Sequence, residues 1–342
     1  MEISPTAPLT DRFGRRHSVL RIGLTERCNL RCVYCMPAAG VPLMPKGSHL
    51  ATDEIARVAR VLAGAGVDRI RLTGGEPLVR KDAVEVARRL GALAGVRSLA
   101  MTTNALLLER HLPALVEAGL THLTISLDTL RPERFEALTR RDGLAGVLGA
   151  VDAALAAGYG TEARPLKVNT VVLRGQNDDE AADLVAWAAG LSSPERRIEL
   201  RFIEAMPFDG NGWGREVLVP WDETKARVEA AHGELVPLVD AAESTSRTFA
   251  VPGTHAVVGF VASMTAPFCA GCNRLRVTAD GALKVCLFGG RETSLRDAMR
   301  AGATDADLLA LVRAALAGKH AAHAGMDALA LTPNRPMVAI GG

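Results

Sequence analysis

The stretch Thr25-Glu26-Arg27-Cys28-Asn29-Leu30-Arg31-Cys32-Val33-Tyr34-Cys35-Met36-Pro37 contains three closely spaced cysteines, which form a first triad. The other three of the six cysteines, Cys269, Cys272 and Cys286, form a second triad. Cysteines grouped this tightly in an intracellular chain are more typical of metal binding than of disulfide bonds. Both triads are therefore candidate sets of metal ligands.

Two kinds of metal site fit such triads to different degrees. A closed structural zinc site normally takes four ligands, whereas each triad supplies three and has no His at ligand spacing. Three thiolates suit a [4Fe–4S] cluster that keeps one iron open for a substrate or cofactor. For the second triad, a zinc site that borrows a distant ligand stays as an alternative, because Cys-x2-Cys pairs are common in zinc proteins.

The composition excludes several classes of protein. The chain has 342 residues and is 48% apolar and 23% charged, which suits one large α/β domain with a sizeable core. No stretch near roughly 20 residues is free of charge, and the N-terminal residues lack the apolar segment of a secretion signal. The 40 basic residues nearly balance the 38 acidic ones, so no nucleic-acid or membrane partner is expected. We expect a cytoplasmic protein.

Six apolar, β-branched runs predict buried strands, and the segments between them predict helices. The predicted strands cover residues 19–24, 69–73, 97–102, 122–127, 167–173 and 198–203. The predicted helices cover residues 53–62, 81–93, 108–118, 143–157 and 178–189, with Thr52 as candidate N-cap of the first. Strands that alternate with helices form parallel βαβ units, so functional side chains are expected where the strands end.

Three segments are expected along the chain. Residues 1–15 are predicted to be a flexible N-terminal arm, and residues 16–206 carry the alternation of strands and helices. Beyond Met206 the alternation stops. Residues 207–342 contain loop-like stretches, shorter strand candidates such as 256–262, and the second triad. They are the expected C-terminal extension on the substrate side.

Several motifs together carry a resemblance to a known family. The first triad has the spacing Cys-x3-Cys-x2-Cys with Tyr34 before its last cysteine, and Gly74-Gly75-Glu76-Pro77 follows the second predicted strand. Both motifs resemble those of the radical S-adenosylmethionine (SAM) superfamily. The second triad with Cys272-Asn273-Arg274-Leu275-Arg276, and the terminal Gly341-Gly342, narrow the resemblance to the GTP 3′,8-cyclase (MoaA) family of molybdenum cofactor biosynthesis.

The resemblance, which extends from about Arg16 to the last residue, implies a fold and a set of cofactors. The fold would be α/β, an incomplete (β/α)6 TIM-type barrel with a C-terminal extension that carries a second Fe–S cluster. The cofactors would be two [4Fe–4S] clusters, one on each triad, and SAM.

The resemblance also implies roles for individual residues. The family's SAM-contacting positions are occupied here by Tyr34, Gly75, Glu76, Ser126 and Met206. Its GTP-contacting positions are occupied by Arg21, Arg71, Thr102, Lys167, Arg274 and Arg276. Arg201, Gly341 and Gly342 correspond to residues at the catalytic centre.

The implied activity is that of a lyase, GTP 3′,8-cyclase. In the family, a 5′-deoxyadenosyl radical from SAM abstracts the ribose 3′ hydrogen of GTP, and the product is (8S)-3′,8-cyclo-7,8-dihydroguanosine 5′-triphosphate. The implied partners are the GTP substrate, a reducing electron donor, a downstream cyclic pyranopterin monophosphate synthase, and a second copy of the chain in a homodimer.

Two other functions fit parts of the sequence. A radical SAM enzyme that modifies peptides typically needs more C-terminal cysteines than the three of this chain. An iron–sulfur electron carrier or a zinc-stabilised binding module leaves Gly74-Gly75-Glu76-Pro77 and the long alternation of strands and helices without a role.

One position departs from the family pattern. Relatives usually have Gly after the motif Thr102-Thr103-Asn104, and this chain has Ala105. If the backbone there has φ > 0, Ala costs about 1 kcal/mol relative to Gly. This departure concerns the geometry of the loop rather than the chemistry.

Overall fold

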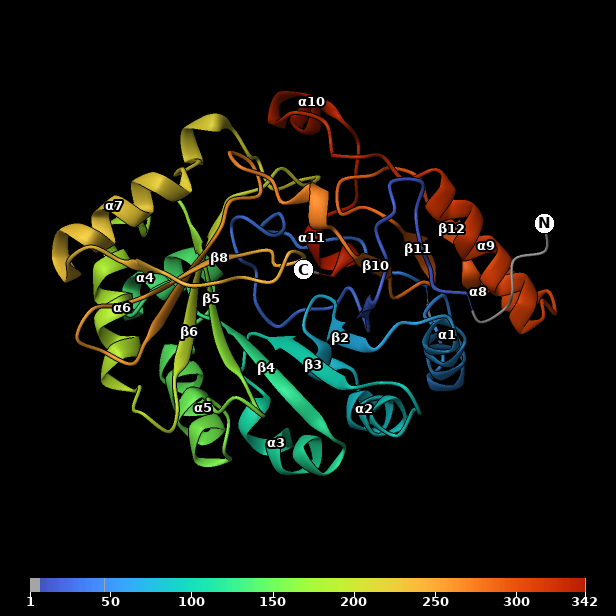
Figure 1. Cartoon of the computed structure of the whole chain (residues 1–342), viewed down its shortest axis with the longest axis horizontal. Helices are drawn as coiled ribbons and strands as arrows, with labels where there is room; N and C mark the ends of the chain where they lie inside the picture. Colours follow the sequence, from blue (N-terminus) through green and yellow to red (C-terminus); the bar gives the residue numbers. More distant parts are fainter. Residues whose placement is uncertain (1–6, 46, 342) are drawn as a thin grey trace.

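The strands of the molecule form one mixed sheet. The computed structural model describes residues 7–45 and 47–341. Within these residues, twelve strands pair in the order β12-β11-β10-β1-β2-β3-β4-β5-β6-β9-β8-β7. From β10 through β1–β6 to β9 every neighbouring pair is parallel, and the strands at both edges are antiparallel. Figure 1 shows the central strands in an arc, with α1, α2, α3, α5 and α6 outside it and the C-terminus inside.

The strands confirm the sequence prediction for the first part of the chain. The six predicted strands are β1 to β6, and the candidate at 256–262 is β9. The strands are Val19–Gly23 (β1), Arg69–Thr73 (β2), Ser98–Thr103 (β3), Leu120–Ser126 (β4), Leu166–Val172 (β5), Ile198–Glu204 (β6), Val236–Pro237 (β7), Arg247–Ala250 (β8), Val257–Val261 (β9), Arg274–Val277 (β10), Ala282–Lys284 (β11) and Thr293–Ser294 (β12).

The helices agree with the prediction up to residue 206, with one addition. The five predicted helices are α1, α2, α3, α5 and α6, whereas α4 and the helices after residue 206 were not predicted. The helices are Thr52–Gly64 (α1), Ala83–Gly91 (α2), Leu108–Glu117 (α3), Pro132–Thr139 (α4), Leu144–Ala156 (α5), Ala181–Gly190 (α6), Trp221–His232 (α7), Leu295–Arg300 (α8), Asp305–Ala317 (α9), Met326–Leu331 (α10) and Met337–Ile340 (α11).

The N-terminus of α1 differs from the prediction. Ala51 is the N-cap, and its backbone N–H donates to the Glu54 carboxylate at 2.8 Å. The Thr52 hydroxyl donates to Asp82 instead of capping the helix. The prediction of Thr52 as N-cap was therefore wrong, because its side chain has a partner outside the helix.

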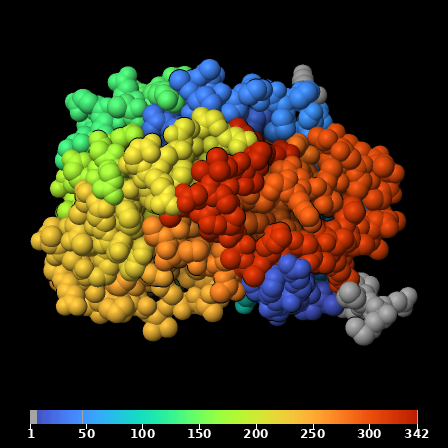
Figure 2. Space-filling model, turned by 90° about the horizontal axis from the view of Figure 1, so that it is seen from above, coloured from blue at the N-terminus to red at the C-terminus, as the bar shows by residue number. Residues whose placement is uncertain are grey.

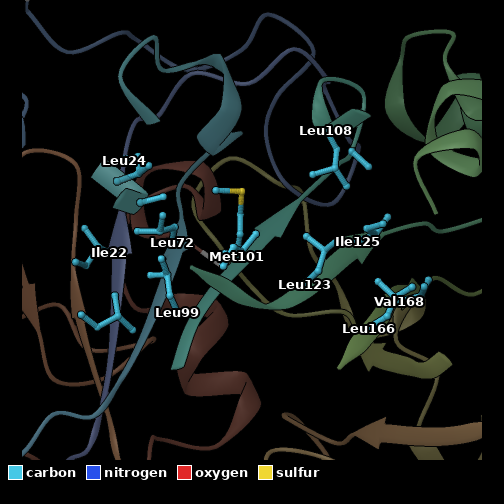
Figure 3. Packing of buried hydrophobic residues seen from close by; sticks show 14 of the residues in the cluster. Ile22, Leu24, Leu72, Leu99, Met101, Leu108, Leu123, Ile125, Leu166 and Val168 are labelled. Carbon is cyan, nitrogen blue, oxygen red and sulfur yellow. The ribbon is translucent and has the colours of Figure 1, made fainter. Parts of the chain in front are cut away.

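The two faces of the sheet carry different side chains. Ile22, Leu72, Met101, Ile125 and Val168 are buried in the main core (Figure 3). Because side chains alternate along a strand, the residues between them point to the opposite face, which carries arginines and threonines. Fully burying an aliphatic side chain contributes about 1.5–3 kcal/mol, so the apolar face stabilises the molecule while the polar face is available for function.

The C-terminal extension shares this sheet and core. Strand β9 pairs with β6, and β10 pairs with β1. The main core includes Leu275 and Val277 of β10 together with Leu308 and Val312 of α9. Residues after 206 therefore complete both sides of the sheet that the first part of the chain begins.

The described part of the expected N-terminal arm, residues 7–15, is packed on the molecule. Leu9 is 1% exposed, and its backbone N–H donates to the carbonyl of Ala65 at 3.1 Å. The backbone N–H of His17 donates to the carbonyl of Leu9 at 2.7 Å.

Among the described residues, none of the helices has the length and apolar character needed to cross a membrane.

Candidate active site

A cavity on the polar side of the sheet brings the two triads together. Its wall includes all six cysteines. The first triad follows β1 and the second triad flanks β10, and these two strands are neighbours in the sheet. This pairing explains why cysteines far apart in sequence share one cavity. Seen from above in Figure 2, the red C-terminal segment lies across the middle of the molecule between the yellow and orange segments.

The first triad lies on a loop that helix α4 holds in place. The backbone N–H groups of Arg31 and Val33 donate to the carbonyls of Thr139 and Leu138, both at 2.9 Å. Burial raises the pKa of the Cys28 thiol to about 11, and it also raises the pKa values of the other two thiols. Thiols in such surroundings ionise when a metal binds the sulfur, because the metal supplies the missing positive charge.

Tyr34 ties this loop to the end of strand β4. Its hydroxyl donates to the Asp128 carboxylate at 2.7 Å, and the other oxygen of Asp128 accepts the backbone N–H of Val171 at 2.9 Å. Burial raises the pKa of Asp128 to about 6, although both hydrogen bonds oppose this shift. Tyr34 and Asp128 both line the cavity, so the predicted SAM position is fixed by a buried carboxylate.

The glycines at 74 and 75 let two loops approach closely. A Cβ on Gly75 would lie 2.3 Å from the carbonyl oxygen of Arg27. The backbone N–H groups of Gly75 and Glu76 donate to the carbonyls of Thr25 and Arg27 at 2.7 and 2.8 Å. Gly74, not Gly75, has positive φ, at 138°. Gly75 is therefore required by backbone contact with the first-triad loop, and Gly74 both by its positive φ and by close contact, since a Cβ there would lie 2.4 Å from the carbonyl oxygen of Thr25.

The Glu76 side chain lies behind the cavity wall. Its carboxylate accepts hydrogen bonds from the Leu78 N–H at 3.0 Å, the Thr103 hydroxyl at 2.8 Å and the Asn104 N–H at 2.7 Å. Burial raises its pKa to about 7. The structure does not bring this predicted SAM contact to the cavity surface, and the carboxylate instead joins the glycine turn to the end of β3.

The loop after β3 contains the position that departs from the family pattern. Ala105 has φ = 66°, which confirms that a left-handed conformation is required there. The side-chain amide of the preceding Asn104 contacts the Sγ of Cys28 at 3.7 Å. The strained residue therefore directly follows a residue that touches the first triad.

The second triad lies among positive charges. The Nζ of Lys319 contacts the Sγ of Cys272 at 3.4 Å. Burial raises the pKa of Cys272, but Lys319 and neighbouring donors outweigh it, so the pKa is lowered overall. Burial also raises the pKa of Cys269, and the hydrogen bond with His323 outweighs it in the same way. The same contact raises the pKa of His323.

Three arginines form a row across neighbouring strands. Arg276 of β10 is in register with Arg21 of β1, which is in register with Arg71 of β2. Arg274 lies two residues before Arg276 on β10, so both point to the same face, as the alternation predicted. Burial and the neighbouring guanidinium groups lower the pKa values of Arg71 and Arg276 to about 10, so both are cations at neutral pH.

These cations have few partners within the protein. Arg21, Arg274 and Arg276 line the cavity, and the buried Nε of Arg21 and NH1 of Arg274 have no hydrogen-bond partner among the described residues. Arg71 is not in the wall and donates to the Thr102 and Thr124 hydroxyls at 3.1 and 2.8 Å. Buried guanidinium groups with unpaired N–H groups and no carboxylate partner among the described residues of the cavity wall favour an anionic ligand there.

A second row of polar residues crosses the other half of the sheet. Ser126 of β4, Asn169 of β5 and Arg201 of β6 are in register, and all three line the cavity together with Met206. The buried Oδ1 of Asn169 has no hydrogen-bond partner among the described residues. This row therefore offers an unused acceptor next to the predicted SAM positions.

Glu199 holds two predicted site cations from behind. Its carboxylate pairs with Nζ of Lys167 at 2.8 Å and with Nε of Arg201. Burial and the charge of Arg201 lower the pKa of Lys167 to about 8. Lys167 does not reach the cavity wall, whereas Arg201 does.

The C-terminal tail reaches the end of strand β2. Gly341 is buried with φ = 83°, and a Cβ there would lie 2.4 Å from the Thr73 hydroxyl oxygen. Its carbonyl accepts a hydrogen bond from Arg276 at 2.8 Å. Gly342 lies outside the described residues.

The donors around the cavity fit iron–sulfur clusters. All six cysteines are free of disulfide bonds. In the described part of the chain, no three His, Cys, Asp or Glu side chains are arranged to hold a single metal ion, whereas a cluster is a larger group with several irons. Clusters take cysteine thiolates as ligands, and each triad supplies three of them on the same cavity. The unpaired polar atoms of Arg21, Arg274 and Asn169 fit bound polar ligands beside them.

Sequence reasoning missed several residues of this region. Asp128 closely follows the end of β4, so its position carried a signal, whereas Asn169 lies in the middle of β5. Glu199 lies two residues before Arg201 on β6, so the two side chains are on the same face of the sheet. Lys319 and His323 follow helix α9, which was itself not predicted.

Comparison with known proteins places the chain in a family. Residues 22–188 match the Radical SAM superfamily model, and residues 198–325 match Molybdenum Cofactor Synthesis C. A protein named GTP 3′,8-cyclase from Rhodopirellula baltica is 42% identical over 340 residues, which cover 98% of this chain and 92% of that relative. The chain belongs to the GTP 3′,8-cyclase family. Membership in this radical SAM family implies a [4Fe–4S] cluster and SAM.

Two further relatives have higher sequence identity to this chain. The mitochondrial GTP 3′,8-cyclase of Arabidopsis thaliana is 50% identical over 334 residues, covering 98% of this chain and 83% of that protein. Molybdenum cofactor biosynthesis protein 1 of Mus musculus is 49% identical over 336 residues, covering 98% of this chain and 51% of that protein. The chain therefore spans about half the length of this second relative.

Solved structures support the fold of the family. Streptococcus suis SuiB bound to S-adenosylmethionine has a TM-score of 0.58 at 14% identity, covering 86% of this chain and 66% of that chain. The enzyme anSMEcpe with bound AdoMet and Cp18Cys peptide has a TM-score of 0.55 at 14% identity, covering 91% and 83%. At this identity the likeness shows the radical SAM fold alone.

Proposed function

We propose that the chain is a GTP 3′,8-cyclase that uses SAM to convert GTP to (8S)-3′,8-cyclo-7,8-dihydroguanosine 5′-triphosphate, an early step of molybdenum cofactor biosynthesis. The observation that carries this proposal is the cavity in which two cysteine triads face the partnerless guanidinium atoms of Arg21 and Arg274. Relatives named GTP 3′,8-cyclase support it. In this proposal β1 to β6 with their helices form the incomplete (β/α)6 barrel, and residues 207–342 form its substrate-side extension.

The first triad would hold the cluster that binds SAM. If bound there, that cluster would supply the electron that cleaves SAM, and the resulting 5′-deoxyadenosyl radical would take the ribose 3′ hydrogen of GTP. The protein places the cofactor with Tyr34, Gly75, Ser126 and Met206, which line the cavity. Apolar wall residues such as Leu30 and Ile203 exclude water from the reacting groups.

The second triad and the arginines would hold GTP. Arg21, Arg274 and Arg276 bind the triphosphate directly, because guanidinium groups match phosphate oxygens in bidentate contacts. Arg71 and Lys167 act from behind: Arg71 orients the Thr102 hydroxyl, and Lys167 shares Glu199 with Arg201. A second [4Fe–4S] cluster on Cys269, Cys272 and Cys286 would face the guanine base. The tail at Gly341, beside Thr73 at the end of β2, would lie next to the SAM site.

Isotope transfer tests the proposed reaction directly. The reconstituted protein is incubated anaerobically with SAM, dithionite and GTP deuterated at the 3′ carbon. We expect 5′-deoxyadenosine only when GTP is present, with deuterium in its methyl group. Equal release without GTP, or release without deuterium, would contradict the proposal.

A pair of arginine variants tests the triphosphate site. Arg21→Met removes a buried guanidinium that has an unpaired Nε, so we expect the KM for GTP to rise roughly 10- to 100-fold through loss of a charged contact. The control is Arg88→Met on the surface of α2, where the guanidinium pairs with Glu85 at 2.5 Å and contributes little. A rise in KM of equal size in both variants would contradict the assignment of Arg21.

The proposed partners follow from the proposed reaction. They are a reducing electron donor, a downstream cyclic pyranopterin monophosphate synthase that consumes the product, and a second copy of the chain in a homodimer. The cytoplasm is the proposed location. Sedimentation of the purified chain at micromolar concentration tests the homodimer.

A further inference from the structure

Lys319 is a buried lysine at the end of helix α9. The inner side of this helix, with Leu308, Val312 and Leu316, belongs to the main core. The backbone N–H of Lys319 donates to the carbonyl of Leu316 at 3.0 Å, which fixes the position from which the side chain starts. Only 4% of Lys319 is exposed, so its ammonium group has left the solvent.

The surroundings of this ammonium group contain sulfur instead of carboxylate. Its Nζ contacts the Sγ of Cys272 at 3.4 Å and the backbone carbonyl of Val285. Among the described residues, no Asp or Glu oxygen lies within 4.0 Å of it. Lys284, which is equally buried, has the Glu292 carboxylate at 3.2 Å. Burying an ammonium without an anion is strongly unfavourable, so the sulfur of Cys272 is the group that can balance the charge.

We propose that Lys319 is a positioning residue of the second triad, whose ammonium donates to the thiolate of Cys272, holds this sulfur in place and balances the charge of a cluster bound there. The proposal rests on the proposed function in that the second triad holds a cluster. Hydrogen bonds to the sulfurs tune the reduction potential of a cluster, and positive charge beside a thiolate favours the more negative, reduced state. Lys319 therefore makes the second cluster easier to reduce.

The first triad has a different arrangement of donors. The Sγ of Cys28 accepts the backbone N–H of Leu30 at 3.4 Å and the side-chain amide of Asn104 at 3.7 Å, and both donors are neutral. A charged donor on one triad and neutral donors on the other would separate the reduction potentials of two otherwise similar clusters. The second cluster would accept an electron more readily than the first.

A redox titration tests this role in the full chain. Cys28→Ser, Cys32→Ser and Cys35→Ser together leave the second triad as the cluster site, and Lys319→Met or Lys319→Arg is then added. We expect Lys319→Met to shift the midpoint potential of the remaining cluster to more negative values, and Lys319→Arg to keep it near the parent. The control is Lys225→Met on α7, where the lysine pairs with Glu229. An unchanged potential in Lys319→Met would overturn the proposal.

A second measurement needs no cluster. In the metal-free chain with the five other cysteines changed to serine, we expect Lys319→Met to slow the alkylation of Cys272 by iodoacetamide, and Lys319→Arg to restore the rate. Circular dichroism checks that each variant is folded. If the second triad of the parent binds no iron, the second cluster of the proposed function is contradicted, and alkylation alone decides the role of Lys319. An equal rate in parent and Lys319→Met overturns it.

Discussion

Ala105 is held in a backbone conformation that residues with a Cβ avoid. Its φ of 66° lies in the left-handed region, and it is 1% exposed. Its N–H donates to the Thr103 hydroxyl at 3.0 Å, and its carbonyl accepts the N–H of Leu108 at 2.9 Å. Thr103 belongs to β3 and Leu108 to α3, so both hydrogen-bond partners are fixed in place. Ala105 therefore cannot relax to a more favourable φ.

Replacing this residue by glycine removes the strain. We expect Ala105→Gly to raise the free energy of unfolding by up to about 1 kcal/mol, with part of the gain offset by the larger entropy of glycine in the unfolded chain. Urea titration measures the change. The control is Ala118→Gly at the end of α3, where φ is −70° and glycine should destabilise. Loss of stability in both variants would contradict the strain at Ala105.

At the scale of single residues, the sequence predicted which residues lie near the site better than it predicted where their side chains point. Arg21, Arg274 and Arg276 line the cavity, as their strand positions indicated. Glu76 follows the end of β2 and Lys167 is the second residue of β5, and their side chains end in hydrogen bonds and ion pairs behind the wall. A motif gives the place of a residue on a strand, but the partners that turn its side chain come from other strands.

At the scale of elements, two glycines in helices differ in their surroundings. A Cβ on Gly91, the last residue of α2, would lie 2.3 Å from the carbonyl oxygen of Ala118 beyond the end of α3. A Cβ on Gly149, in the middle of α5, would meet no atom within 4 Å. The first glycine permits two helix ends to touch, and the second has no such role.

These surroundings predict opposite effects of the same substitution. Gly149→Ala should stabilise the protein by about 0.5–1 kcal/mol, because alanine is the better helix former. Gly91→Ala should destabilise it by roughly 1–3 kcal/mol, because the helix ends must separate. Urea unfolding of both variants measures the two signs. A gain in stability for Gly91→Ala would show that the contact between α2 and α3 yields easily.

Two of the helices that sequence reasoning missed, α7 and α9, differ in the signal that their sequences carry. Helix α7 buries only Thr224 and Val228, so its apolar periodicity is too weak to stand out between loops. Helix α9 did carry a readable signal: Thr304 and Asp307 form a capping box, and buried residues such as Leu308 and Val312 recur at helical spacing. The central strands were predictable because each is a short apolar run.

At the scale of the whole molecule, the N-terminal segment braces the loop of the second triad. The Arg15 guanidinium donates to the carbonyls of Cys269 at 2.8 Å and of Ala321 at 2.6 Å. Asp11 pairs with Arg15 at 2.6 Å and with the buried ring of His17 at 3.1 Å. These contacts join the beginning of the chain to residues near its end.

Protonation of the unfolded chain at His17 should make the fold less stable in mild acid. Burial and the charge of Lys319 lower the pKa of His17 from 6.5 to about 4, although Asp11 opposes the shift. The unfolded chain therefore binds a proton at higher pH than the folded chain, so this contribution to stability is lost as the pH falls from about 6.5 to about 4. A shift of this size corresponds to roughly 3 kcal/mol.

Comparison with a variant isolates this contribution. The free energy of unfolding of the parent minus that of His17→Gln should decrease between pH 6.5 and pH 4 and then level off. Urea titrations at half-unit pH steps measure it. A constant difference across this range would show that His17 does not titrate as its burial indicates.

The meeting of the two triads was the least predictable feature. Each triad is recognisable from local spacing, but their place on one cavity depends on the pairing of β10 with β1, and no local pattern specifies which distant strand lies beside β1. The resemblance to a family implied a cluster on each triad and an extension on the substrate side, and the register of Arg21 with Arg276 shows how the sheet brings the two parts of the chain together.

The same pairing has a consequence for how the chain is made. Strand β2 is synthesised soon after β1 and can pair with one edge of it. The other edge of β1, where Val19 pairs with Arg274, stays unpaired until β10 has been synthesised. At about 5–20 residues per second, the ribosome leaves this edge open for tens of seconds. An open edge can pair with another chain, so nascent copies on one messenger are at greatest risk of aggregation in this interval. Strand β10, which the second triad flanks, thus also prevents β1 from pairing with another nascent chain.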